Sequence, residues 1–195
     1  MAFRTVCVYA GSNPGTDPSH ADAARALGGL LAAQGTGLVY GGGRTGLMGV
    51  VADAVLEAGG EAVGIIPGGL ERREVAHRGL TELVVVDTMH ERKTLMAERA
   101  DAFVALPGGL GTIEELVEVA TWTQLGIHHK PVGLLDSAGY WGPFDAFLDH
   151  AVVAGFLRAE NRAAIVLDPD PAALLERLVA WRPTSVQKWL ELDER

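Results

Sequence analysis

The residue types best suited to chemistry lie in one glycine-rich segment, residues 107–115, which reads PGGLGTIEE. It follows a short apolar run with the length of a buried strand, and a long helical pattern begins at Thr112. Glycines let the backbone approach a ligand closely, and the first N–H groups of a helix have no partner within the helix. This order of elements predicts an anion site, such as one for a phosphate, to which Thr112 adds its hydroxyl.

Glu115 is the unexpected residue of this segment, because a carboxylate in contact with a bound phosphate would repel it. The spacing Thr112-x-x-Glu115 fits a capping box, in which Glu115 accepts a hydrogen bond from the N–H of Thr112. Alternatively, Glu115 faces a part of the ligand beyond the phosphate, such as a sugar ring. The local pattern leaves both interpretations open.

A second segment with chemical potential is Thr88-Met89-His90-Glu91-Arg92-Lys93. Thr88 and Glu91 have the spacing of a capping box at the start of a helix. Two cations in the first turns of that helix oppose its dipole. They are either solvated surface charges or groups that neutralise an anion bound at the end of the preceding strand, where Arg92 could also donate a hydrogen bond to a leaving group.

The elements that must position these residues alternate along the chain. Strands are predicted at residues 5–9, 37–40, 62–66, 83–86, 102–106, 131–135 and 163–167. Helices are predicted at residues 18–34, 46–58, 89–99, 112–125, 143–154 and 171–180. A charged loop is expected at residues 70–79, and the tail, 186–195, is weakly helical.

This alternation predicts an α/β protein: a single-domain, Rossmann-like, doubly wound parallel sheet of about seven strands with helices on both faces. We expect residues 1–195 to form one nucleotide-binding domain. Four predicted strands, the first, second, third and fifth, end in glycine clusters. The carboxyl ends of parallel strands share one edge, so the four clusters predict a ligand crevice there.

Composition limits the partners and the compartment. The net charge of −9 argues against nucleic acid and anionic membranes as partners. The lone Cys7 lies in a predicted strand, so no disulfide framework is expected and a reducing compartment is indicated. No apolar run approaches the ~20 residues of a membrane span, and the N-terminus lacks a secretory signal pattern. We therefore expect a cytoplasmic protein.

Other chemistries find less support. The glycines at positions 41, 43 and 46 have the spacing of a dinucleotide-binding fingerprint. The acidic residue at the expected distance, Glu61, however lies at the beginning of the next predicted strand, whereas a ribose-binding acid lies at its end. Neither glycine loop continues as the Gly-Lys-Ser/Thr of a P-loop. Ser12 has no GxSxG context, and no histidine or cysteine spacing predicts a metal site.

From Leu116 to Leu125, the predicted helix at residues 112–125 is apolar on most sides, which indicates more burial than a surface helix needs. Either a large core or a subunit interface would provide that burial. We favour a homodimer.

Two motifs together point to a known family: PGGxGTxxE, matched in full by residues 107–115, and Met89-His90-Glu91-Arg92-Lys93. Supporting matches are the glycines from Gly41 to Gly49, the sequence GIIP at 64–67, and TWxQLG at 121–126. The chain resembles, over about residues 6–180, the LOG ("lonely guy") family of cytokinin riboside 5′-monophosphate phosphoribohydrolases, which are often labelled lysine decarboxylases.

The resemblance implies hydrolysis of the N-glycosidic bond of purine riboside 5′-monophosphates, AMP included, to a free base (cytokinin or adenine) and ribose 5-phosphate. It implies Arg92 and Glu115 as the catalytic pair, and we expect no cofactor and no metal. The expected substrate-binding residues are Glu74, Lys93, Gly108, Gly109, Gly111, Thr112, Thr121, Gly42, Gly43 and Met89. Thr121 lies about 120° from Glu115 on an ideal helix, so a site containing both needs a neighbouring segment or a second subunit. We expect a homodimer with the site near its interface.

Two alternatives stay open: a non-hydrolytic carrier of nucleotide or molybdenum cofactor on the same fold, and a nucleosidase of broader specificity. The intact pair of Arg92 and Glu115 argues for the enzyme, since a carrier has no need of that carboxylate. Decarboxylation of lysine fails on chemistry, because a pyridoxal enzyme needs a Schiff-base lysine. The only candidate, Lys93, lies beside Arg92.

Overall fold

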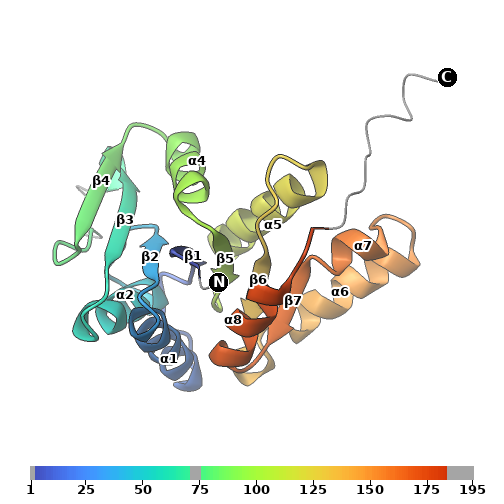
Figure 1. The fold of residues 1–195 in the computed structure, drawn as a ribbon, viewed down its shortest axis with the longest axis horizontal. Coiled ribbons are helices and arrows are strands. Elements are labelled where there is room, and N and C mark those ends of the chain that lie inside the picture. The colour runs from blue at the N-terminus through green and yellow to red at the C-terminus, as the bar shows by residue number, and fades with distance from the viewer. Residues whose placement is uncertain (1–2, 71–75, 184–195) are drawn as a thin grey trace.

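Seven parallel strands form one sheet in the computed structural model, which describes residues 3–70 and 76–183. Their order is β4-β3-β2-β1-β5-β6-β7, and every neighbouring pair is parallel (Figure 1). The strands are β1 (Thr5–Tyr9), β2 (Gly37–Tyr40), β3 (Ala62–Pro67), β4 (Glu82–Val86), β5 (Ala102–Ala105), β6 (Val132–Leu135) and β7 (Ile165–Asp168). The predicted α/β fold is confirmed.

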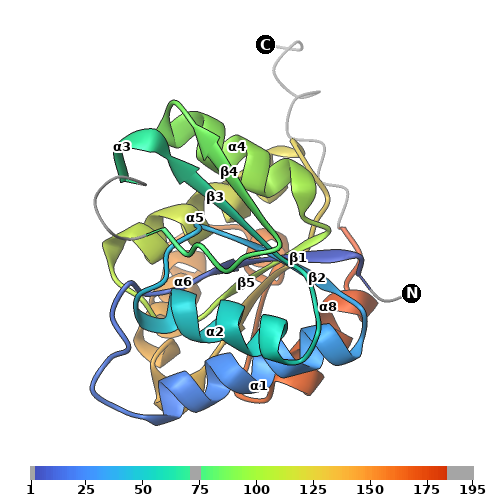
Figure 2. The same cartoon turned by 90° about the vertical axis from the view of Figure 1, so that its left-hand side faces the viewer.

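Helices cover both faces of this sheet, as the doubly wound pattern predicts (Figure 2). One face carries α1 (Ser19–Ala33), α2 (Gly46–Glu57) and α8 (Pro171–Ala180). The other carries α4 (Met89–Arg99), α5 (Leu110–Leu125) and the start of α6 (Gly142–Val153). Three single-turn segments, α3 (Gly68–Leu70), η2 (Ser137–Gly139) and α7 (Ala159–Arg162), lie in the connections.

The central strand β1 shows why short apolar runs become strands here. Successive side chains of a strand point to opposite faces, and both faces of this sheet are covered. Val6 and Val8 therefore enter the core beneath α1 and α2, whereas Cys7 and Tyr9 enter the core beneath α4 and α5. All four are at most 2% exposed, which explains the lack of polar residues in the run.

The strand order reverses at β1. From β1 the chain adds β2, β3 and β4 outward on one side, and then returns to place β5 against the other side of β1. The loops that follow β1 and β5 consequently leave the sheet toward opposite faces, and a crevice opens between them. This position holds the predicted glycine segment.

The start of α5 differs from prediction in a way that matters for the site. The helix begins at Leu110, two residues before the predicted start, with Gly109 as an extended N-cap that supplies no side-chain cap. Thr112 therefore lies inside the first turn, and the capping-box interpretation of Thr112 and Glu115 is wrong.

Two further differences concern the C-terminal part. Strand β7 begins at Ile165, not at residue 163, because residues 159–162 form the helical turn α7, which was not predicted. The weakly helical tail predicted at 186–195 lies outside the described residues, as does part of the charged loop predicted at 70–79.

Candidate active site

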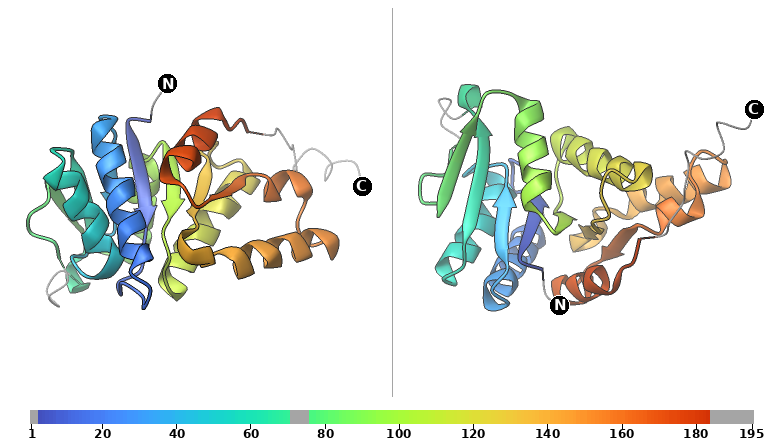
Figure 3. Two further views of the ribbon diagram at one scale, coloured as in Figure 1. Left: turned by 90° about the horizontal axis from the view of Figure 1, so that it is seen from below. Right: turned by 45° about the horizontal axis from the view of Figure 1, so that its top comes forward.

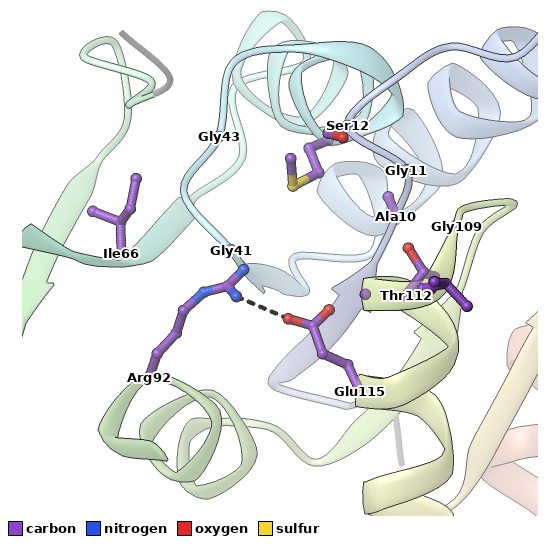
Figure 4. A pocket seen from close by; sticks show the side chains of 13 residues that line it. Ala10, Gly11, Ser12, Gly41, Gly43, Ile66, Arg92, Gly109, Thr112 and Glu115 are labelled. Atoms are coloured by element: carbon purple, nitrogen blue, oxygen red, sulfur yellow. Dashed lines mark ion pairs between the residues drawn. The ribbon is translucent and has the colours of Figure 1, made fainter. Parts of the chain in front are cut away.

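A cavity of about 440 Å³ lies at the carboxyl edge of the sheet, where the strand order reverses. Its walls come from the ends of three strands and from three helices (Figure 4). The lining residues are Ala10, Gly11 and Ser12 after β1, Gly41 and Gly43 after β2, Met48 of α2, Ile66 of β3, Arg92 of α4, and Gly109, Leu110, Gly111, Thr112 and Glu115 at the start of α5. The ligand crevice predicted from the glycine clusters thus has a counterpart in the structure.

An ion pair between Arg92 and Glu115 forms the floor of this cavity. Nη1 of Arg92 lies 2.9 Å from Oε1 of Glu115, and the two side chains point toward each other from α4 and α5 (Figure 4). They are only 10% and 11% exposed. Arg92 was predicted either as a solvated charge or as a site residue, and its burial in the cavity wall excludes the first interpretation.

The surroundings of Glu115 alter its protonation. Burial raises the pKa of Glu115 above its ordinary value of 4.5, and the neighbouring charge of Arg92 opposes that rise. The net direction is upward, because a carboxylate at this depth loses more solvation than one guanidinium restores. A buried carboxyl with a raised pKa in a cleft is typical of a catalytic centre.

The N-terminus of α5 forms the opposite wall. Gly109 and Gly111 have open space where a Cβ would lie, so a ligand can approach their backbone. Thr112 is buried, and its side chain fills the space that a Cβ of Gly108 would need. The first N–H groups of the helix are thereby presented to the cavity, as the predicted anion site requires.

Gly11 was not predicted as a site residue, although it connects three segments of the site. Its N–H donates to the carbonyl of Pro107 at 3.0 Å, and its own carbonyl accepts from the N–H of Leu47 at 2.9 Å. The glycine loop after β5 and the start of α2 are thus both fixed to the loop after β1. The signal was present in the sequence as the first of the four glycine clusters.

The glycine loop is also held from the far side by Tyr140, which sequence reasoning missed. The hydroxyl of Tyr140 donates to the carbonyl of Gly108, and the ring stands edge-on to His20, which is hydrogen-bonded to Ser137 at 2.7 Å. Gly108 and Tyr140 line an adjoining cavity that shares Gly11, Ser12 and Gly109 with the first. No sequence pattern indicates this contact.

Several predicted site residues are not among those that line this cavity in the described part of the chain. Gly42 is in the left-handed region, with φ of 73°, and its carbonyl accepts from His77 N–H at 2.8 Å. Met89 has its Sδ 3.9 Å from Nη1 of Arg92. Thr121 is exposed on α5, where its hydroxyl donates to the carbonyl of Val117. Glu74 lies outside the described residues.

Lys93 contacts two carboxylates away from the cavity lining. Its Nζ donates to Glu114 at 2.6 Å and to Glu118 at 2.9 Å, which ties α4 to α5. Burial lowers the pKa of Lys93, but these two hydrogen bonds outweigh burial and the net shift is upward. A lysine held protonated in this way is poorly suited to forming a Schiff base, which needs the neutral amine.

Two negative findings concern the described residues, 3–70 and 76–183. Among them, no three His, Cys, Asp or Glu side chains gather as a metal-binding group. No helix in the same part of the chain has the length and apolarity to cross a bilayer. The absence of a metal from the reaction stays a prediction.

Comparison with known proteins decides the family. Residues 48–178 match the family model described as "possible lysine decarboxylase". The cytokinin riboside 5′-monophosphate phosphoribohydrolase LOG of Oryza sativa subsp. japonica is 50% identical over 181 residues, which cover 93% of this chain and 75% of that protein. LOG7 of Arabidopsis thaliana, with the same activity in its name, is 46% identical over 98% of this chain and 90% of its own length.

The chain belongs to the LOG family. The resemblance inferred from PGGxGTxxE and the segment 89–93 is therefore confirmed. In this LOG protein the two motifs are the ones that supply Arg92, Glu115 and the N-terminus of α5 to the cavity.

Solved structures share the fold of this LOG protein at lower identity. The structural-genomics target TM1055 is 26% identical, with a TM-score of 0.70 over 91% of this chain and 99% of that one. A molybdenum cofactor binding protein from Rippkaea orientalis is 21% identical, with a TM-score of 0.67 over 92% of this chain and 98% of that one. The second likeness shows a common fold and nothing about ligands.

Proposed function

We propose that this chain hydrolyses the N-glycosidic bond of cytokinin riboside 5′-monophosphates and releases the free base and ribose 5-phosphate. The observation that carries the proposal is the buried pair of Arg92 and Glu115 on the floor of a cavity whose wall is a helix N-terminus. An anion site next to a carboxylate of raised pKa suits a phosphorylated sugar. The curated relatives carry this activity in their names.

The first step of the mechanism is fixation of the 5′-phosphate. The N–H groups from Gly109 to Thr112 provide donors and the positive end of the α5 dipole. Since a helix rises about 1.5 Å per residue, Glu115 stands about 4.5 Å further along the axis than Thr112. A ribose held by its phosphate over the first turn is thereby placed beside the Glu115 carboxylate.

The second step is cleavage of the bond between C1′ and the base. Glu115 stabilises the positive charge that develops on the ribose, or orients the attacking water, as carboxylates do in glycoside hydrolysis. The electron pair of the breaking bond leaves with the purine, whose charge Arg92 stabilises through its guanidinium. Water supplies the hydroxyl that ends on C1′, and its remaining proton ends on the departing base.

We include AMP among the substrates. The groups in the described cavity address the phosphate and the ribose, which AMP and its N6-prenylated relatives share. The cavity also has an apolar lining that would contact the rest of the substrate, and it comes from Met48, Ile66 and Leu110. We also retain Glu74, Lys93, Met89, Gly42, Gly43 and Thr121 as proposed binding residues, within one nucleotide-binding domain that works in the cytoplasm.

We further propose a homodimer with the site near its interface. Helix α6 has no fully buried residue within this chain, although its sequence is largely apolar. Phe147, Val153 and Phe156 on and after α6 are 60%, 86% and 92% exposed, and Val117 and Leu125 of α5 are also exposed. A second copy of the chain would cover these side chains, and α5 connects them to the cavity.

The decisive experiment follows base release from AMP and from isopentenyladenosine 5′-monophosphate by chromatography. Glu115→Gln preserves shape and removes the charge, so turnover should fall about 100-fold or more while nucleotide binding, measured by calorimetry, persists. Glu114→Gln is the matched control, because Glu114 is the adjacent glutamate and its side chain is 56% exposed.

Release by the wild type and the control, but not by Glu115→Gln, would support the assignment. Full activity of Glu115→Gln would contradict it. Tight nucleotide binding without release by any of the three proteins would favour a carrier instead. Release from pyrimidine or guanine nucleotides at similar rates would favour the broader nucleosidase.

A further inference from the structure

Gly41, the residue that follows β2, has no conformational need to be a glycine. Its φ lies outside the left-handed region, whereas Gly42 beside it and Gly46 further on have φ of 73° and 61°. An alanine at position 41 would thus adopt the same backbone without strain. The reason for a glycine must lie in what occupies the space of its missing side chain.

That space is filled by the guanidinium of Arg92. A Cβ on residue 41 would overlap Nη2 of Arg92, and it would lie 3.0 Å from Cζ and 3.6 Å from Nε of the same side chain. All three of the nearest atoms belong to this one group. Figure 4 shows the guanidinium lying directly beside Gly41.

The other edges of the guanidinium are also occupied. Nε donates to the carbonyl of Ile65 at 3.0 Å, from the buried strand β3, and Nη1 pairs with Glu115 at 2.9 Å. A planar group held at two edges and against a backbone surface has one position and one plane. Contacts from β2, β3 and α5 therefore fix a side chain that starts on α4.

We propose that Gly41 is a positioning residue for the hydrolysis: the space left by its missing side chain seats the Arg92 guanidinium and aims it at Glu115 and the departing base. This inference rests on the proposed function for the role of Arg92 in catalysis. The seat itself rests on the contacts between Gly41, Ile65 and Arg92.

Gly41→Ala is the direct test. The added methyl collides with the far end of a flexible side chain, so the fold should persist while the guanidinium is displaced. A displacement of about 1 Å in a catalytic group can cost about 100-fold in rate. We expect kcat for base release to fall by about that factor, with a smaller change in KM, because the phosphate loop is untouched.

Gly37→Ala is the matched control. Gly37 starts the same strand, its φ also lies outside the left-handed region, and a Cβ there would meet the carbonyl of Arg4 at an ordinary 3.6 Å. It contributes nothing to the cavity. We expect kcat and KM of this variant to match those of the wild type.

A second measurement reports on the seat without relying on turnover. Displacing Arg92 removes the counter-charge of Glu115, so the pKa of Glu115 should rise further in Gly41→Ala, as measured by carboxyl carbon NMR.

The titratable groups that interact with Glu115 are Arg92 and Lys93 of α4, Glu114 of α5, and Tyr9 and Cys7 of β1. Lys93 is paired with Glu114 and Glu118, and burial raises the pKa of both Tyr9 and Cys7, which keeps them neutral.

The Arg92→Ala variant distinguishes an effect of Gly41→Ala that acts through Arg92 from a general disturbance of the fold. If Gly41 acts through Arg92, adding Gly41→Ala to Arg92→Ala should leave the Glu115 titration unchanged, since the group to be displaced is gone. A further shift in the double variant would overturn the proposal, as would wild-type kcat and titration in Gly41→Ala. A wild type that releases no base would refute the proposed function alone, and the titrations would still decide the seat.

Discussion

The proposed chemistry depends on Glu115 and Arg92, and each of the two side chains is buried against the other. The pair is not a stabilising device in itself, because removing two charges from water costs about as much as their attraction returns. In the proposed mechanism, the pair instead gives the substrate a carboxylate and a guanidinium that are already desolvated and oriented beside the proposed phosphate site.

A pH dependence follows from the burial of Glu115. The proposed mechanism needs the carboxylate, and burial raises the pKa of this carboxyl above 4.5. Activity should therefore be lost, as pH falls, at a pH higher than an exposed glutamate would give. The measurement is kcat/KM for AMP against pH at fixed ionic strength, with circular dichroism confirming that the protein stays folded.

The sign of this effect is fixed by its cause. A group with a raised pKa takes up its proton earlier on acidification, so the acid limb moves up the pH scale. If kcat/KM fell to half its maximum only at or below pH 4.5, that result would contradict the role of Glu115. Glu114→Gln, which removes one charge that raises the pKa of Glu115, should move the limb slightly downward.

At the scale of the element, the start of α4 determines where Arg92 emerges. The hydroxyl of Thr88 accepts from the N–H of Glu91 at 3.1 Å, and the Glu91 carboxylate accepts from the N–H groups of Thr88 and Asp87. This is the capping box that the sequence predicts. It holds the first turn of α4 and thus the direction in which Arg92 enters the cavity.

Thr88→Ala should destabilise the protein by about 1 kcal/mol, because it leaves the N–H of Glu91 without its acceptor. Thr88→Ser keeps the hydroxyl and should cost less. Urea denaturation measures both, and the midpoint should fall for alanine with an unchanged m-value. Equal midpoints for the alanine and serine variants would show that the cap contributes nothing.

Two segments with the same Thr-x-x-Glu spacing differ in whether they cap a helix. Thr88-x-x-Glu91 forms a capping box, whereas Thr112-x-x-Glu115 does not. In the second segment, Gly109 takes the extended conformation of an N-cap, so α5 begins at Leu110, two residues before Thr112. Glu115 then lies more than a turn inside the helix, where it is free to meet Arg92 instead.

At the scale of the whole molecule, the apolar side chains exposed on α5 and on and after α6 form the surface that the proposed second copy of the chain would cover. The views in Figures 1 and 3 agree that α6 and α7 lie at the end of the sheet formed by β7. Large exposed apolar side chains gathered on adjacent elements are typical of interaction surfaces. From the sequence, the apolar faces of α5 could be buried either in the core or in a subunit interface. Val117 and Leu125 are exposed, so these two side chains are not part of the core.

We expect the wild type to have about twice the 20.6 kDa mass of the chain by light scattering at micromolar concentration. Phe147→Glu should shift it toward the monomer, because a charge buried in an interface is strongly unfavourable. Val85→Glu is the control, since Val85 is half exposed on β4 at the opposite edge of the sheet. A monomeric wild type, or a dimer unaffected by Phe147→Glu, would contradict this interface.

The sequence alone determined the strands, the glycine-lined edge and the family, because these depend on local patterns. Apolar runs, glycine turns and capping residues act over a few positions, so the boundaries of β1, β2, α4 and α8 follow from the residues themselves. Arg92 and Glu115 were named through the family motifs and lie together in the cavity.

The tertiary structure alone decided which of these residues meet. Arg92 and Lys93 are neighbours in sequence, but successive helix residues point about 100° apart, so one enters the cavity and the other binds Glu114 and Glu118. The seat at Gly41 joins a strand end to a side chain from a distant helix. No local pattern records such a contact, because it exists only once β2, β3, α4 and α5 have packed around the same edge.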